Sequence, residues 1–214
     1  MNALIKRLTL PVILCLLPMA LGLFLYPQLP AQIPSHWGFD GTVNDYMSKV
    51  AMVFGMPLFM AAMTIFVAFM MEHDPKKRNQ AGAIKTLSLW LCPVMSLLLV
   101  PMSLFIALGY DLPVATIICI FVGLLFVIIG NYLPKSKQNY TIGIRLPWTL
   151  NSEENWNRTH RLAGKIWVLM GLVMVLMALF AGQTVWFTAL FTITILLIST
   201  TPALYSYCLY RNGI

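Results

Sequence analysis

Six apolar stretches, each long enough for a membrane-spanning helix, alternate with short polar segments along this chain of 214 residues. A helix that crosses the hydrocarbon core of a bilayer needs about 20 predominantly apolar residues. The stretches are Leu8–Tyr26, Val50–Met71, Thr86–Leu108, Pro113–Gly130, Gly164–Ala181 and Val185–Cys208. The pattern therefore predicts an all-α polytopic membrane protein that folds as a bundle of six transmembrane helices.

Composition and charge agree with a membrane protein and predict its orientation. Only 10% of the residues are charged, against about 25% in an average soluble domain. The net charge of +7 does not indicate direct nucleic-acid binding, because the charges lie in short segments between the apolar stretches. Thirteen of the fourteen lysine and arginine residues fall on one side of the predicted membrane, and Lys49 alone falls on the other. By the positive-inside rule, we predict that both termini are cytoplasmic.

The first outer loop, Tyr26–Lys49, contains three prolines and two glycines and is expected to form an ordered loop or a short hairpin. Its candidate ligand-facing residues are His36, Trp37, Asp40 and Asp45. Two interpretations are open: His36 and the two aspartates bind a cation, or these side chains cap turns in a packed loop. One histidine and two aspartates without a fixed ligand spacing do not define a metal site, so no metal or other cofactor is predicted.

The polar segment between the fourth and fifth stretches, residues 131–165, holds six of the fourteen basic residues and is called the basic loop. Its first half cannot be one helix, because it contains Pro134, Gly143 and Pro147. Within it, residues 141–145 are expected to be extended. Its second half is predicted to be a cytoplasmic interfacial helix that continues into the fifth span. Asn151 is the predicted N-cap, with Glu154 three residues later as in a capping box.

The basic loop also supplies a candidate surface for a cytoplasmic partner. Arginine makes bidentate contacts to carboxylates, and tryptophan prefers the membrane interface. The candidate partner-facing residues are Asn139, Arg145, Trp148, Glu154, Trp156, Arg158, His160 and Arg161. An equally open alternative is that they hold the loop against the phosphate groups of the lipid bilayer.

Catalysis is not predicted. Glu153, Glu154 and His160 place acids and a base on one helix, but the chain has no HExxH, GxSxG or phosphate-loop motif. The helix-capping and interface interpretation explains these residues without chemistry. We therefore predict that the protein is not an enzyme.

The predicted spans contain no Asp, Glu, Lys or Arg near their centres, which disfavours an ion-coupled transporter. Hydroxyl groups on one face of the sixth span are expected to bond to another helix; they belong to Thr184, Thr188, Thr192 and Ser199. Small residues at seven-residue spacing predict close helix contact; they are Gly123, Gly130, Gly164, Gly171 and Ala178.

Two segments resemble known families. Residues 33–49 read IPSHWGFDGTVNDYMSK and are similar to the small membrane domain of unknown function DUF1648. Residues 130–165 read GNYLPKSKQNYTIGIRLPWTLNSEENWNRTHRLAGK and resemble the cytoplasmic motif of the SdpI family. The resemblance predicts a DUF1648-like region over residues 1–75 and an SdpI-like region over residues 76–214.

The SdpI family comprises immunity proteins against a secreted sporulation-delaying peptide toxin. The resemblance implies an integral protein of the bacterial cell membrane that protects its cell from a membrane-active peptide toxin. For the founding member it also implies a signalling role, in which the loaded protein holds a winged-helix repressor at the membrane. A small membrane transporter or efflux component is the alternative, and the sequence leaves the ligand, the regulator and the homo-oligomeric state open.

Overall fold

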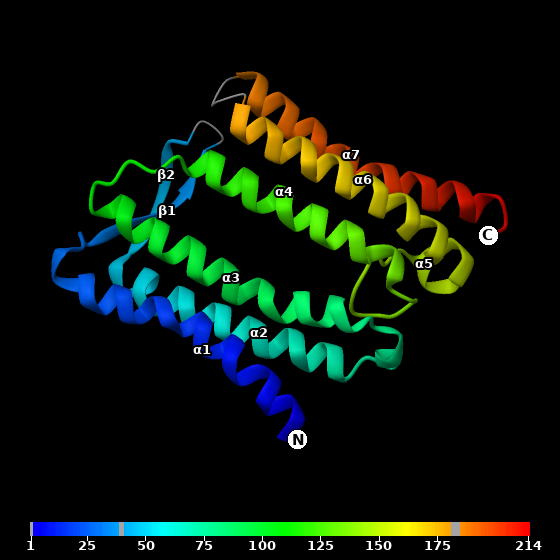
Figure 1. Ribbon diagram of the computed structural model, residues 1–214, viewed down its shortest axis with the longest axis horizontal. Coiled ribbons are helices and arrows are strands. Elements are labelled where there is room, and N and C mark those ends of the chain that lie inside the picture. The colour runs from blue at the N-terminus through cyan, green and yellow to red at the C-terminus, as the bar shows by residue number, and fades with distance from the viewer. Residues whose placement is uncertain (1, 39–40, 181–184) are drawn as a thin grey trace. The chain divides into compact units, whose positions relative to one another are not determined.

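The computed structural model describes residues 2–38, 41–180 and 185–214 (Figure 1). Within these described residues, six helices are long and apolar enough to cross a membrane. They are α1 (Asn2–Leu25), α2 (Met56–Glu72), α3 (Gly82–Ala107), α4 (Val114–Tyr132), α6 (Glu153–Phe180) and α7 (Val185–Arg211). The predicted all-α class and the six predicted spans are thereby confirmed.

Shorter elements lie between these helices. They are the strands β1 (Gln32–Trp37) and β2 (Val43–Ser48), the π-helical segment Ala51–Gly55, the helix α5 (Pro147–Asn151), and 3-10 turns at Tyr26–Gln28, Lys77–Asn79 and Leu133–Lys135. The chain divides into two compact units. Unit 1 comprises Met1–Met70 and Thr86–Pro113, and unit 2 comprises Met71–Lys85 and Val114–Ile214. Each unit is therefore built from segments that are separated in the sequence.

Unit 1 contains the hairpin expected between the first and second spans. Strands β1 and β2 pair antiparallel, and the fully buried side chain of Ile33 on β1 packs into the core that the hairpin shares with the helices of this unit. Lys49 follows β2 and donates hydrogen bonds from Nζ to the carbonyl oxygens of Tyr26 (3.2 Å) and Leu29 (3.0 Å). The one basic residue of this loop therefore fixes the hairpin to the turn that follows α1.

Unit 2 is organised by α4, α6 and α7, which run alongside one another (Figure 1). A Cβ atom added to Gly171 of α6 would lie 2.5 Å from the carbonyl oxygen of Gly123 on α4. One added to Gly164 would lie 2.7 Å from the carbonyl oxygen of Gly130. Such distances leave room for hydrogen only. The predicted close helix contact is confirmed, and it joins the fourth span to the fifth.

The hydroxyl row of α7 bonds differently from the expectation. Thr192 Oγ1 donates to the carbonyl oxygen of Thr188 (2.9 Å), and Ser199 Oγ donates to that of Ile195 (2.9 Å). A hydroxyl on an exposed helix face is satisfied at least cost by the preceding turn of its own helix. The prediction of helix–helix hydrogen bonds is therefore wrong for Thr192 and Ser199, while Thr184 lies outside the described residues.

The polar element before the fifth span consists of α5 and the first turns of α6. Asn151 ends α5, and Ser152 has an extended backbone between the two helices. The hydroxyl oxygen of Ser152 accepts a hydrogen bond from the backbone N–H of Asn155 (3.2 Å), so Ser152 caps α6. The predicted N-cap at Asn151 is wrong by one residue. The additional helix itself is confirmed, and Glu153 lies in its first turn, where the helix dipole favours an acid.

Candidate functional site

The first half of the basic loop has an irregular backbone that folds around a buried amide. Asn139 is fully buried, and its Oδ1 accepts the backbone N–H groups of Thr141 (3.0 Å) and Ile142 (2.7 Å). Its Nδ2 donates to the carbonyl oxygen of Lys137 (2.9 Å). The predicted extended segment at residues 141–145 is wrong, because side-chain hydrogen bonds shape a series of bends there and no strand forms.

A buried aromatic pair on α6 supports this loop. The rings of Trp156 and His160 stack with centroids 4.0 Å apart, and Trp156 Nε1 donates to the carbonyl oxygen of Ser136 (2.7 Å). His160 Nε2 accepts the backbone N–H of Ile144 (3.0 Å). Nδ1 must then carry the ring proton and donate to the carbonyl oxygen of Trp156 (2.8 Å). Both ring nitrogens are engaged, so this histidine is placed to support the fold rather than to transfer protons.

Gly143 passes directly over this pair. Its φ of +122° lies in a region that side chains rarely adopt. A Cβ atom at this position would lie 2.6 Å from His160 Nε2 and 2.8 Å from Trp156 Cη2. The glycine of the Ile-Gly-Ile motif is therefore required both by its backbone conformation and by the close approach of the loop to α6.

A second buried polar group, which sequence analysis did not identify, ties the segment between α2 and α3 to the basic loop. Asp74 is buried, and one carboxylate oxygen accepts hydrogen bonds from Thr141 Oγ1 (2.6 Å), the Tyr140 N–H (3.0 Å) and Gln80 Nε2 (3.1 Å). The other oxygen accepts the Lys76 N–H (2.7 Å). Burial raises the pKa of Asp74, but these hydrogen bonds, led by that of Thr141, outweigh burial and hold the pKa below its ordinary value.

Gln138 extends this connection toward α5. Its Oε1 accepts a hydrogen bond from Lys76 Nζ, and its Nε2 donates to the carbonyl oxygens of Thr149 (2.9 Å) and Leu150 (2.8 Å). Asn79 Nδ2 donates to the Gln138 carbonyl oxygen (2.8 Å). A polar hollow of about 320 Å³ lies beside these contacts. Its lining residues are Asn79, Lys137, Gln138, Glu153 and Asn157.

The start of α6 is also joined to the end of α7. The side-chain oxygen of Asn155 accepts hydrogen bonds from the hydroxyls of Ser206 (2.6 Å) and Thr159 (3.1 Å), and its Nδ2 donates to the Ser206 carbonyl oxygen (3.0 Å). Trp148 of α5 stacks on Tyr210 of α7, with centroids 5.9 Å apart. The basic loop is thus held on three sides, by α6, by α7 and by the segment between α2 and α3.

The eight candidate partner-facing residues divide into two groups. Asn139, Trp156 and His160 are buried inside the loop, and Trp148 is half-buried against α7. The exposed ones are Arg145, Glu154, Arg158 and Arg161. Glu154 and Arg158 form an ion pair one turn apart on α6, and Arg145 Nη1 donates to the carbonyl oxygen of Tyr140 (2.8 Å). Three of the four exposed candidates are therefore arginines.

On the hairpin of unit 1, His36 and Asp45 are paired across the two strands and both are exposed. His36 Nδ1 lies 2.6 Å from Asn44 Oδ1. Asp40 lies outside the described residues, so a cation site that includes it stays a prediction. Within the described part of the chain, no three His, Cys, Asp or Glu side chains are grouped to hold a metal ion.

Parts of this chain are similar to two known families, and nearly all of it aligns with one known protein. Residues 135–205 match the SdpI/YfhL protein family, and residues 13–61 match the domain of unknown function DUF1648. The chain is 27% identical over 208 residues to a protein named Immunity protein SdpI from Bacillus subtilis (strain 168), across 97% of this chain and 99% of that protein. No solved structure matches the chain. The resemblance noted from the sequence is confirmed: this multi-pass membrane protein is similar to the SdpI/YfhL family over residues 135–205 and to the DUF1648 domain over residues 13–61.

Proposed function

We propose that this chain is an immunity protein of the cell membrane that protects its cell from a secreted, membrane-active peptide. The observation that carries the proposal is the alignment with an immunity protein over 97% of this chain and 99% of that relative. An alignment of this extent spans both polar surfaces, the hairpin of unit 1 and the basic loop of unit 2. Both termini are cytoplasmic in this proposal, because thirteen of the fourteen basic residues then face the cytoplasm.

The hairpin is the proposed peptide-facing element. His36, Asp45 and Tyr46 are exposed on it, and Trp37 is partly exposed. Aromatic side chains beside charged ones suit the headgroup region of a membrane, where a membrane-active peptide first meets the protein. The hairpin is anchored through buried Ile33, so its exposed side chains are presented by a rigid base.

The basic loop is the proposed surface for a cytosolic partner. Arg145, Arg158 and Arg161 are exposed on it, and arginine suits recognition of carboxylates on another protein. A winged-helix repressor is the partner that the family resemblance implies. The loop is hydrogen-bonded through Asp74 to the segment that connects α2 with α3. A peptide that binds two arrangements of these helices with different affinity would thereby bias the loop as well.

Survival of a sensitive bacterium tests the proposal. Cells that express the chain are challenged with a panel of secreted membrane-active peptides, with membrane abundance measured in parallel. We expect selective protection against one peptide and its loss in the Trp37→Ala variant. Lack of protection against every peptide, at normal abundance, would overturn the immunity function.

Two further measurements separate the finer parts of the proposal. The double variant Arg158→Gln with Arg161→Gln is expected to retain protection and to lose capture of the cytosolic partner, and unchanged capture would remove the partner role of these arginines. The transporter alternative predicts that collapse of the proton gradient abolishes protection. Sequestration of the peptide predicts that protection persists without the gradient.

A further inference from the structure

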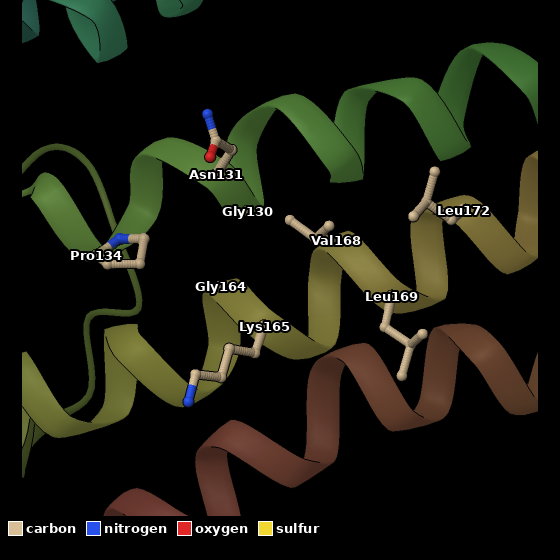
Figure 2. Close-up of a pocket in the computed structure, with 8 residues that line it drawn as sticks. All are labelled: Gly130, Asn131, Pro134, Gly164, Lys165, Val168, Leu169 and Leu172. Carbon is tan, nitrogen blue, oxygen red and sulfur yellow. The ribbon is translucent and has the colours of Figure 1, made fainter.

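A groove opens between α4 and α6 at the polar end of their glycine contact. It has a volume of about 420 Å³ and is lined by Gly130, Asn131, Pro134, Gly164, Lys165, Val168, Leu169 and Leu172. Figure 2 shows Gly130 and Gly164 facing each other between the two helices, with Val168 and Leu172 extending toward α4. The two glycines bring the backbones of α4 and α6 into contact beside this groove.

The groove is polar at one end and apolar at the other. Asn131 and Lys165, the first and last residues of the basic loop, are both exposed at one end of the groove. Toward the membrane interior, Leu169 and Leu172 are exposed by 58% and 47%. The amide and the ammonium group suit the phosphate group of a phospholipid, and the strip of aliphatic side chains suits its acyl chain.

No carboxylate among the described residues neutralises Lys165. The two ion pairs found among the described residues are Lys77–Glu72 and Arg158–Glu154, so no described carboxylate pairs with Lys165. Its long apolar stem can lie along the groove while the ammonium group stays at the headgroup level. A basic residue beside a pocket between transmembrane helices is a recurrent setting for anionic lipid headgroups.

We propose that this groove binds one anionic phospholipid, with its phosphate at Lys165 and an acyl chain along Val168, Leu169 and Leu172. Charge selects this occupant, because the polar end of the groove offers an unpaired cation and no described acid. The bound lipid covers the exposed leucines of the groove and links α4 to α6 beside their closest contact. It thereby supports the helices from which the basic loop starts and to which it returns.

Native mass spectrometry of the full chain in mild detergent tests this site. Phosphatidylglycerol and phosphatidylcholine with the same acyl chains are titrated separately. We expect one phosphatidylglycerol to bind more tightly than phosphatidylcholine, and Lys165→Gln to weaken phosphatidylglycerol binding by about fivefold, as expected for one basic residue at an anionic headgroup. Equal affinity for the two lipids would overturn the proposal.

Two control variants locate the lipid. Arg161→Gln removes an exposed cation one turn earlier on α6, outside the groove, and is expected to change binding by less than twofold, about the scatter of a peripheral charge. Asn131→Phe replaces the exposed amide at the polar end of the groove with a larger apolar ring, and is expected to abolish binding of the tightly bound lipid. An equal effect of Arg161→Gln and Lys165→Gln, or full binding by Asn131→Phe, would refute the site.

The same spectra distinguish the other occupants. A dimer that disappears in Asn131→Phe would assign the groove to a second copy of the chain, and would refute the lipid. Displacement of the lipid by inorganic phosphate at millimolar concentration would show that Val168, Leu169 and Leu172 contribute nothing to lipid binding, and would refute the phospholipid site. Thermal unfolding of each variant verifies that a loss of lipid does not follow from a loss of fold.

Discussion

Replacement of Asp74 by Asn should loosen the basic loop while the helices stay folded. Asp74 accepts four hydrogen bonds, from Lys76, Gln80, Tyr140 and Thr141. Asparagine has nearly the same shape but only one acceptor oxygen, so its NH₂ group must face at least one of these donors. The segment between α2 and α3 then loses part of its attachment to the loop.

The size of the effect follows from the number of bonds lost. A hydrogen bond to a charged group contributes about 1.5–3 kcal/mol, and Asp74→Asn loses at least one such bond. Since about 1.4 kcal/mol corresponds to a factor of ten, the open form of the loop should become about ten- to a hundredfold more populated.

Limited trypsin digestion measures this opening, because Lys137 and Arg145 are exposed within the loop and cleavage requires local unfolding. Cleavage at these two sites should accelerate by the same factor in Asp74→Asn. Asp45→Asn is the matched control, since Asp45 is exposed on the hairpin. Equal cleavage rates for Asp74→Asn and the wild-type chain would refute the role of Asp74 in holding the loop.

The same carboxylate predicts a pH dependence. Because the pKa of Asp74 is lower in the folded chain than its ordinary value, ionised Asp74 stabilises the fold above the unfolded pKa of about 3.9. That stabilisation is lost as the pH falls through the folded pKa. The difference in cleavage or unfolding between the wild-type chain and Asp74→Asn should therefore be full at pH 7 and shrink below about pH 4. A difference that is constant across this range would contradict the assignment.

Two other substitutions test the remaining contacts by thermal unfolding in detergent. Gly143→Ala should destabilise the fold by about 1–3 kcal/mol, because the new methyl group strains the backbone and overlaps with Trp156 and His160. Gly82→Ala is the control, since a Cβ atom there meets no atom within 4 Å. Equal unfolding midpoints for the two variants would contradict the packing of Gly143 against the aromatic pair. Asn155→Ala should cost about 1–3 kcal/mol, because it leaves buried polar partners on α7 unpaired. Asn157 is a neighbouring exposed residue, and Asn157→Ala should have little effect on stability. Equal stability of the Asn155→Ala and Asn157→Ala chains would argue against the link between Asn155 of α6 and Ser206 of α7.

The fold was largely predictable because its physical cause is local in sequence. A run of about 20 apolar residues can satisfy its backbone in a membrane only as a helix, so each span is visible without knowledge of its neighbours. The contact of α4 with α6 was partly visible as well, since glycines at seven-residue spacing, such as Gly164 and Gly171, return to one helix face.

The interior of the basic loop was not predictable in the same way. The role of Asp74 depends on Tyr140 and Thr141, more than sixty residues further along the chain. Serine and asparagine are both good N-caps, so the residue type alone does not decide between Asn151 and Ser152. Ser152 is the N-cap of α6 because Asn151 is still the last residue of α5. One visible feature was overlooked: Asp74 precedes Pro75 in a segment between two spans, and aspartate is a frequent residue at such turns.

The division of the loop into a buried frame and an exposed surface determines how mutational data on it should be interpreted. Trp156 is fully buried, stacks on His160 and bonds to the loop backbone. Its replacement by Ala would remove the support of the whole loop, so a lost function would report a lost fold. Arg158 and Arg161 project from the same helix, and their side chains lie outside this frame. A defect caused by these arginines in a chain with unchanged unfolding would therefore be evidence for a partner, whereas a defect at Trp156 would not.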